Sequence, residues 1–183
     1  MSPNIIKPIL QLNGARIYLR PLKVEDAPIF LEATQVEEIR HMTGLKRNFN
    51  LAEIEAHIRR CLDHPLRYDF AICLQADHRM IGELSVLEID PENLTAEFRI
   101  ALSQIRFTSQ GYGSEAIELI KTWAFKQLRL KTLSLQVFGH NPRGIRAYEK
   151  CGFQVMEVKK EAFEYQDKYS DEIMMQARNP LYE

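Results

Sequence analysis

A glycine-rich turn at residues 109–116 is the first candidate for chemistry in this chain of 183 residues. It reads Ser-Gln-Gly-Tyr-Gly-Ser-Glu-Ala and precedes a stretch of helical spacing. Gly111 and Gly113 can adopt backbone conformations closed to other residues, and they let a ligand approach the main chain. The free N–H groups and the dipole of the following helix favour an anion. The turn therefore predicts a phosphate site, although on its own it is equally typical of a plain helix-starting loop.

The same turn also fits a relaxed dinucleotide-binding fingerprint, Gly111-x-Gly113-x-x-Ala116. That fingerprint belongs in a tight turn directly after a parallel strand, whereas here about eight residues separate the preceding predicted strand from Gly111. It also requires an acidic residue about 20 positions further on, at the end of the next strand. Residues 133–139 contain none. A nucleotide-binding oxidoreductase is therefore the least favoured function.

A second group of candidates, Asn141, Gly144 and Tyr148, follows at helical spacing. On a helix, Gly144 and Tyr148 share a face. The small residue would let a ligand chain lie against the helix, and the tyrosine could present its hydroxyl to that ligand. An isolated tyrosine with this spacing is more often an aromatic core residue, so this group alone does not predict a site.

Together the two groups resemble the motifs of the GNAT superfamily of N-acetyltransferases. The turn Gln-Gly-Tyr-Gly-Ser-Glu-Ala is followed some 30 residues later by Val137-x-x-x-Asn141-x-x-Gly144-x-x-x-Tyr148-Glu-Lys-x-Gly-Phe. The run Ile-x-Leu-Arg-Pro-Leu-x-x-Glu-Asp at residues 17–26 looks like the opening of the RimJ/RimL and spermidine acetyltransferase branch. The paired motifs at this separation are specific, although each one alone is not.

The resemblance covers nearly the whole chain and implies one GNAT-like domain over residues 1–183. Its fold class is mixed α/β, with a central, mostly antiparallel twisted sheet that is split into a V and flanked by helices. Acetyl-CoA would lie in the split, with its pantetheine paired to the backbone near residues 100–102 and its diphosphate on the amides of residues 110–114. The cofactor-binding residues implied are Ile100, Ala101, Leu102, Gln110, Gly111, Tyr112, Gly113, Ser114, Asn141 and Gly144.

The sequence departs from the family pattern in three places. The family favours Gln or Arg three residues before the first motif glycine, where this chain has Thr108. The loop at residues 103–108 is about one residue longer than the pattern and lacks its common proline. Gly144 replaces the usual Ala, which costs roughly 1 kcal/mol of helix stability. Because amides make most of the phosphate contact, we expect Thr108 to weaken the site rather than abolish it.

Acetyl transfer from a thioester to an amine, the activity that the resemblance implies, poses two proton problems. An amine with a pKa of about 10.4 must lose a proton before it attacks, and the leaving thiolate gains from a nearby acid. The family's acid is the tyrosine matched by Tyr148, because a phenol with a pKa near 10 is protonated at neutral pH. A main-chain N–H near residues 100–102 could stabilise the carbonyl oxygen. For the base, Glu97 resembles a glutamate of this branch; Glu83 is the rival, and both could equally be solvated strand carboxylates.

Several amines could be the acceptor: a protein N-terminus, a polyamine, an aminoglycoside or another small amine. We expect residues 41–50 to border the acceptor site, where Lys46 and Arg47 would disfavour a polycation. A non-catalytic acyl-CoA sensor on the same fold is the alternative function. Tyr148 favours the enzyme, whereas Thr108 leaves room for the sensor.

Apolar spacing predicts the elements that position these residues. A strand at residues 16–22 and two helices precede a three-stranded antiparallel meander, after which a helix, a strand, a helix and two closing strands follow. The ranges are 25–36 and 51–62 for the first helices, 70–74, 80–89 and 94–102 for the meander, 132–138 for the next strand, and 153–158 and 172–177 for the last two. Asn50 with Glu53 forms a variant capping box, and Asn141-Pro142 starts the last helix.

Composition limits the class of protein. A net charge of −1 disfavours nucleic acid as the main partner, and 45% hydrophobic residues disfavour disorder. No stretch is apolar enough to span a bilayer, and Lys7-Pro8 interrupts the apolar N-terminus, so no membrane partner or signal peptide is expected. Three isolated cysteines and five histidines without ligand spacing predict neither disulfide nor metal. A cytoplasmic location follows, and an exposed strand edge near the C-terminus could support a homodimer.

Overall fold

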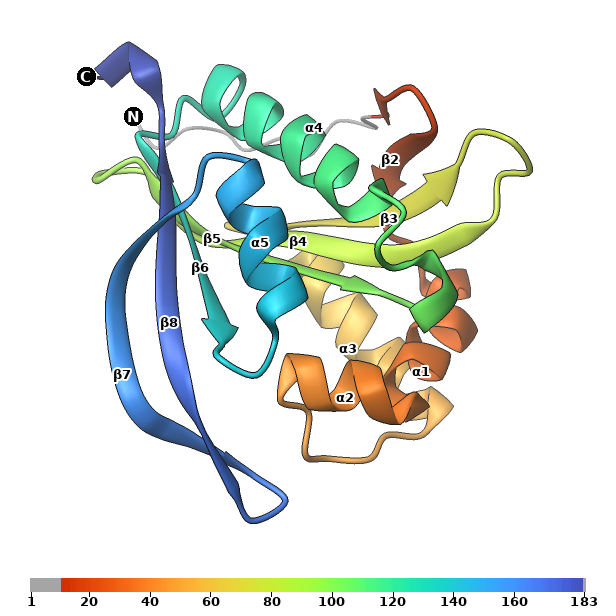
Figure 1. The fold of residues 1–183 in the computed structure, drawn as a ribbon. Helices are drawn as coiled ribbons and strands as arrows, with labels where there is room; N and C mark the ends of the chain where they lie inside the picture. The colour runs from red at the N-terminus through yellow and green to blue at the C-terminus, as the bar shows by residue number, and fades with distance from the viewer. Residues whose placement is uncertain (1–10, 183) are drawn as a thin grey trace.

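The computed structural model describes residues 11–182, which form an eight-stranded sheet with helices on both faces (Figure 1). The strand order is β1-β2-β3-β4-β5-β6-β8-β7. The strands are β1 Leu12–Asn13, β2 Ile17–Pro21, β3 Tyr68–Leu74, β4 Met80–Asp90, β5 Thr95–Leu102, β6 Thr132–Phe138, β7 Gln154–Tyr165 and β8 Lys168–Arg178. The helices are α1 Ala27–Gln35, α2 Glu37–Thr43, α3 Leu51–Asp63, α4 Tyr112–Lys126 and α5 Pro142–Lys150, with short 3-10 turns η1 Val24–Asp26, η2 Ile105–Phe107 and η3 Pro180–Tyr182.

The sheet is split between β5 and β6, its one parallel pair of neighbours among the described strands. These strands pair only through Thr95–Glu97 and Thr132–Ser134 and then diverge (Figure 1). The side of β5 that faces β6 is therefore without a strand partner from residue 98 onward. This arrangement confirms the predicted mixed α/β fold with a mostly antiparallel sheet split into a V.

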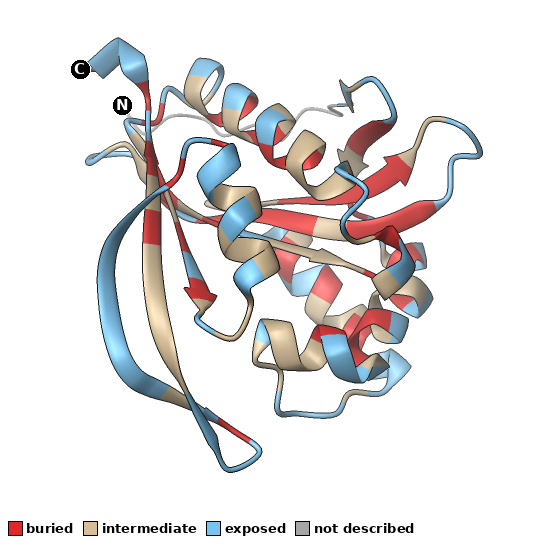
Figure 2. Cartoon of the chain, in the orientation of Figure 1, coloured by how far each residue is buried: buried red, intermediate tan, exposed pale blue. Residues whose placement is uncertain are grey.

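Each face of the sheet packs on its own helices. The larger core lies under α4 and α5 and includes Leu84, Phe98 and Ile120, and the smaller core lies under α1 and α3 and includes Ile54 and Ile58 (Figure 2). Successive strand residues point to opposite faces. Phe98 and Ile100 therefore belong to the α4 and α5 face. The alternate residues of β5 (Glu97, Arg99 and Ala101) face α1, α2 and α3, as does Glu83, which lies opposite Ala101.

Both predicted asparagine caps are confirmed. The Asn50 side chain accepts a hydrogen bond from the Glu53 amide at 3.0 Å, and the Glu53 carboxylate accepts one from the Asn50 amide at 3.0 Å. The Asn141 side chain accepts from the Gly144 amide at 2.9 Å. These side chains satisfy N–H groups that the first helical turn cannot pair internally, which fixes where α3 and α5 begin.

The structure differs from the predicted elements in three respects. Residues 41–49 are not wholly irregular, because α2 runs through Thr43 and ends at Gly44 in the left-handed conformation (φ 72°). Strand β1 is not predicted, since two residues carry no periodicity. The closing strands are longer than residues 153–158 and 172–177, because β7 is an exposed edge strand and lacks the alternation of a half-buried strand.

No helix among residues 11–182 has both the length and the apolar character needed to cross a membrane. Within the same residues, no group of three or more His, Cys, Asp or Glu side chains is placed to hold a metal ion.

Candidate active site

The glycine-rich turn lies at the N-terminus of α4, and no side chain of residues 11–182 caps that helix. Gly111 is the N-cap residue and has a φ of 86°, a conformation that favours glycine. Arg16 braces the turn from outside, because its guanidinium donates to the Gln110 carbonyl at 2.8 Å and to the Glu115 carboxylate at 3.2 Å. The first N–H groups of this 15-residue helix therefore remain available to an anion.

A cavity of 170 Å³ lies beside this turn. It is lined by the end of β5, the turn, α5 and part of α2. Eight of the ten predicted cofactor-binding residues line it: Ile100, Ala101, Leu102, Gly111, Gly113, Ser114, Asn141 and Gly144. The other two, Gln110 and Tyr112, turn their side chains away, toward the Arg106 carbonyl and the Arg16 guanidinium. The backbone of the turn faces the cavity, as a site built on main-chain amides requires.

Gly144 lies close to Asn141 in the first turn of α5. A Cβ atom at residue 144 would lie 2.6 Å from Asn141 Nδ2 and 3.0 Å from its Cγ. An alanine would therefore displace the capping side chain, which gives a local reason for glycine at this position. Both residues line the cavity, so the cap also shapes the wall against which a ligand would lie.

Tyr148 lies one turn further along α5, where the 170 Å³ cavity opens into a larger one. Its ring packs edge-on against Phe98 and Phe153, with centroids 6.5 Å and 6.0 Å away. Burial, with a smaller effect of Cys151, raises the pKa of the Tyr148 hydroxyl to about 12. The phenol therefore stays protonated over the whole physiological range and can act as a proton donor.

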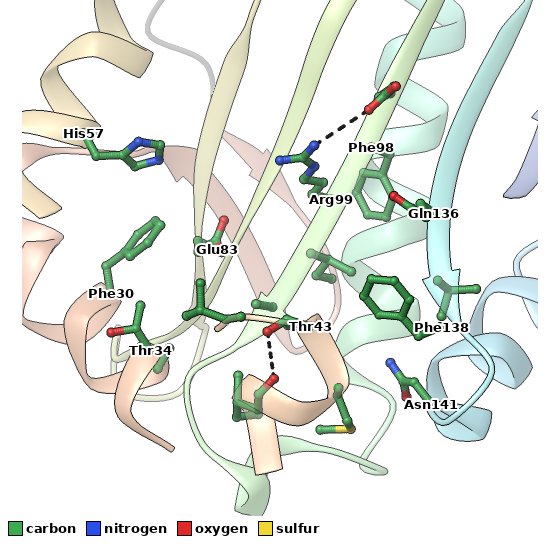
Figure 3. Close-up of a pocket in the computed structure, with 18 of the residues that line it drawn as sticks. Phe30, Thr34, Thr43, His57, Glu83, Phe98, Arg99, Gln136, Phe138 and Asn141 are labelled. Carbon is green, nitrogen blue, oxygen red and sulfur yellow. Dashed lines mark hydrogen bonds and ion pairs between the residues drawn. The ribbon is translucent and has the colours of Figure 1, made fainter. Parts of the chain in front are cut away.

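The larger cavity has a volume of 610 Å³ and lies on the α1, α2 and α3 side of the sheet. Aromatic and aliphatic side chains form most of its wall: Phe30, Ile39, Met42, Leu45, Phe49 and Phe138. Polar groups enter from β4, β5 and α3, among them Glu83, Arg99 and His57 (Figure 3). Of residues 41–50, which we expect to border the acceptor site, Met42, Thr43, Leu45 and Phe49 line this cavity.

Glu83 is the carboxylate most changed by its surroundings. It projects from the middle of β4, between Ala71 on β3 and Ala101 on β5. Desolvation, followed by repulsion from Asp69, raises the pKa of the Glu83 carboxyl to about 7. Asp69 is itself buried and neutralised by Arg67 at 2.7 Å. Among residues 11–182, no side chain forms a hydrogen bond or ion pair with Glu83.

Glu97 lines the same cavity in a different setting. Its carboxylate lies 3.9 Å from the Arg99 guanidinium, and its side chain is 46% exposed. It stands where β5 still pairs with β6, opposite Ser134. The structure thus brings both predicted carboxylates to one cavity, with Glu83 the more buried and the less paired.

Some residues of the site have no sequence signal. Arg143 lines the smaller cavity, although neither motif includes it. Phe30 and His57 line the larger one from α1 and α3, and their helical spacing is that of ordinary core residues. Lys46 and Arg47, expected near the acceptor, are absent from its lining; they lie instead over the rings of Phe163 and Phe49.

The chain is similar in sequence to proteins of a known family. The model of the acetyltransferase (GNAT) domain family matches residues 16–154. A probable N-acetyltransferase of Bacillus subtilis, YjcK, is 25% identical over 176 residues, which are 92% of this chain and 97% of that protein. The spermidine N(1)-acetyltransferase of Vibrio cholerae is 30% identical over 78 residues, or 43% of this chain and 44% of that protein.

The fold has close structural neighbours as well. The crystal structure of spermidine N-acetyltransferase from Vibrio cholerae, in complex with CoA and spermine, superposes with a TM-score of 0.84 at 22% sequence identity. The match covers 92% of this chain and 99% of that one. The matched family segment contains both motifs and every residue of the two cavities. The chain belongs to the GNAT acetyltransferase family, and it is an acetyl-CoA-dependent N-acetyltransferase.

Proposed function

We propose that this enzyme acetylates a small primary amine that carries one positive charge on an apolar or aromatic body. In this proposal acetyl-CoA occupies the smaller cavity and the acceptor occupies the larger one. The observation that carries the proposal is the position of Tyr148, whose side chain lines both cavities. A group at this junction can reach the sulfur of a thioester that is attacked from the acceptor side.

Tyr148 is the proposed general acid. The amine nitrogen attacks the acetyl carbonyl carbon, the bond between carbon and sulfur breaks, and the Tyr148 hydroxyl gives its proton to the departing thiolate. A pKa of about 12 keeps that proton on the free enzyme at neutral pH. Backbone N–H groups of β5 beyond residue 98 face the split and supply donors for the carbonyl oxygen.

Glu83 is the proposed base, and Glu97 is the alternative. A base must be largely deprotonated at the working pH and yet hold a proton readily, which a pKa of about 7 provides. Glu83 lies opposite Ala101, in the stretch of β5 expected to pair with pantetheine. Glu97 lies further from that stretch, beside Arg99. The amine proton would therefore pass to Glu83, directly or through one water, and leave to solvent.

The residues that line the larger cavity favour an acceptor with a single amino group. Its two carboxylates are Glu83 and Glu97, and the Arg99 guanidinium offsets one of them. One negative charge remains for one ammonium group. A polyamine such as spermidine carries several positive charges, and the aromatic walls of Phe30 and Phe49 offer no anionic partner for the others. The fold that this chain shares with the spermidine acetyltransferases therefore does not make spermidine its acceptor.

Thiol release from acetyl-CoA tests the acceptor and the two roles. We expect 2-phenylethylamine to give a kcat/KM about 10-fold or more above that of spermidine, since each unpaired charge in an apolar pocket is costly. Tyr148→Phe should lower kcat about 100-fold with unchanged acetyl-CoA affinity. The ratio of wild-type to Glu83→Gln activity should approach one below pH 6 and rise through pH 7, because only the deprotonated carboxylate accepts a proton.

Three outcomes would contradict the proposal. A preference for spermidine would refute the acceptor class. A Glu97→Gln variant that loses more activity than Glu83→Gln would transfer the role of base to Glu97. Binding of acetyl-CoA without turnover of any amine would support the acyl-CoA sensor.

The cytoplasmic location and the homodimer remain predictions. The dimer would use the edge of β7, where Val155, Met156 and Val158 are exposed. A single sedimentation experiment at two protein concentrations tests the dimer, and a monomer at both would contradict it.

A further inference from the structure

We propose that Arg143 binds the diphosphate of acetyl-CoA and that Glu38 holds the guanidinium over the cavity until the ligand displaces it. This inference rests on the proposed placement of acetyl-CoA in the smaller cavity. Arg143 lies in the first turn of α5, next to Gly144 and near the glycine-rich turn of α4. Neither sequence motif assigns a binding role to Arg143.

Charge is the first reason. Among the described residues that line the smaller cavity, no side chain other than Arg143 carries a charge at neutral pH. The N-terminus of α4 contributes about half a positive charge. A diphosphate carries more than one negative charge, so the helix alone leaves an excess. A guanidinium at the same cavity can balance it and can bind two phosphate oxygens at once.

Thr108 fixes the direction of the guanidinium. Its hydroxyl donates to the Ile105 carbonyl at 2.6 Å, so its oxygen is left to accept from Arg143 Nη1, at 2.8 Å. Thr108 lines the same cavity three residues before Gly111. The hydrogen bond therefore holds the cation on the side of the cavity where the turn begins.

Glu38 supplies the contact that a ligand can replace. Arg143 Nη2 donates to Glu38 Oε1 at 2.7 Å and lies 3.2 Å from Met42 Sδ. The Glu38 side chain is 51% exposed and that of Arg143 is 33% exposed. Ion pairs that water reaches contribute little. Phosphate oxygens held by the helix N-terminus can therefore take the place of this carboxylate without a large penalty.

Arg16 does not fill this role, although it lies near the same turn. Its guanidinium donates to the Gln110 carbonyl and to Glu115, and it is not part of the cavity wall. Its place is behind the turn, where it supports the backbone. Arg143 is the arginine on the ligand side.

The test compares acetyl-CoA with acetyl-pantetheine, which has the same thioester arm and no phosphate. Binding of each is measured by calorimetry for wild type, Arg143→Gln and Arg143→Lys, and the fold of each variant is checked by its melting temperature. Arg146→Gln, which removes an exposed charge from the same helix, is the matched control. We expect Arg143→Gln to weaken acetyl-CoA binding about 10- to 100-fold and acetyl-pantetheine binding less than about 2-fold. Arg143→Lys should be intermediate, and the control should change neither.

Equal weakening of both ligands by Arg143→Gln would overturn the inference, since it would mean that the residue only braces α5 against α2. An unchanged affinity for acetyl-CoA would overturn it as well. A Glu38→Gln variant separates the two roles further: its acetyl-CoA affinity should be equal to or above that of wild type, whereas a fall as large as that of Arg143→Gln would indicate a structural brace. If wild type itself fails to bind acetyl-CoA, the proposed function fails, and that result is distinct from these.

Discussion

The two cavities that meet at Tyr148 are built from different groups. The smaller one, of 170 Å³, is lined by the end of β5, the glycine-rich turn, α5 and part of α2. The larger one, of 610 Å³, is lined by side chains from α1, α2, α3 and three strands of the sheet, β4, β5 and β6. The strand end and the motif glycines of the smaller cavity can recognise only what all acyl-CoA donors share. A wall of side chains can differ from one relative to the next, and this difference separates what the family fixes from what each member chooses.

Of the substitutions that test the difference between the two cavities, the one expected to have the largest effect is at Gly111. Gly111→Asp places a side chain at a φ of 86° and a negative charge in the anion site, so acetyl-CoA binding should fall about 100-fold or more. Gly152→Asp is the matched control, because Gly152 has a φ of 85° and lies outside both cavities. Calorimetry measures both. Equal losses in the two variants would show that backbone strain, rather than the anion site, controls binding.

A smaller and more selective effect is expected at Phe30, which lines the larger cavity but not the smaller one. Phe30→Ala removes an aromatic wall, so the KM for 2-phenylethylamine should rise about 10-fold while the KM for acetyl-CoA stays within about 2-fold. Steady-state kinetics with each substrate varied in turn measures the split. If both KM values rise together, the cavities are not independent binding sites.

A third effect concerns stability and pH. Burial raises the pKa of the Glu83 carboxyl to about 7 in the folded protein, above its ordinary pKa in the unfolded chain. The free energy of unfolding therefore falls as the pH rises from that ordinary pKa toward 7. Glu83→Gln should therefore match wild type near pH 4 and exceed it at pH 8 by about 2 kcal/mol, a shift of about 4–8 °C in Tm. Thermal melts at the two pH values measure it. Glu97→Gln, whose side chain is 46% exposed, should stay within about 0.5 kcal/mol of wild type at both.

Local signals made the cosubstrate side predictable. The strand at residues 132–138 matches β6, and both asparagine caps act within three residues of themselves. Gly111, with a φ of 86°, marks a turn that depends on the backbone freedom of glycine, whereas Gly113 is already part of α4. The acceptor side had no such signal, because Phe30, His57 and Glu83 come from three elements and meet only after the sheet has formed. The periodicity of apolar residues predicts which side of a helix or strand is buried. It does not distinguish a residue of the hydrophobic core from one that lines a pocket.

Arg143 illustrates the same limit within the cosubstrate side. The sequence has Thr108 where the family pattern has Gln or Arg, and from the sequence alone this difference predicts a weaker phosphate site. In the structure Thr108 is a hydrogen-bond partner of Arg143, 35 residues later in the chain. The contact depends on how α5 packs beside the turn, and no spacing rule within either motif describes it.

The short seam between β5 and β6 has a consequence for how the molecule opens. Three residue pairs join the five-stranded block β1–β5 to the three-stranded block β6–β8, whereas β6 and β8 share seven. The amides that pair across this seam should accordingly exchange with solvent faster than those that pair β6 with β8. An acyl-CoA arm lying in the split would hydrogen-bond where the second strand is missing. The cosubstrate would then complete the sheet as well as react, and its arrival would tie the two blocks into one.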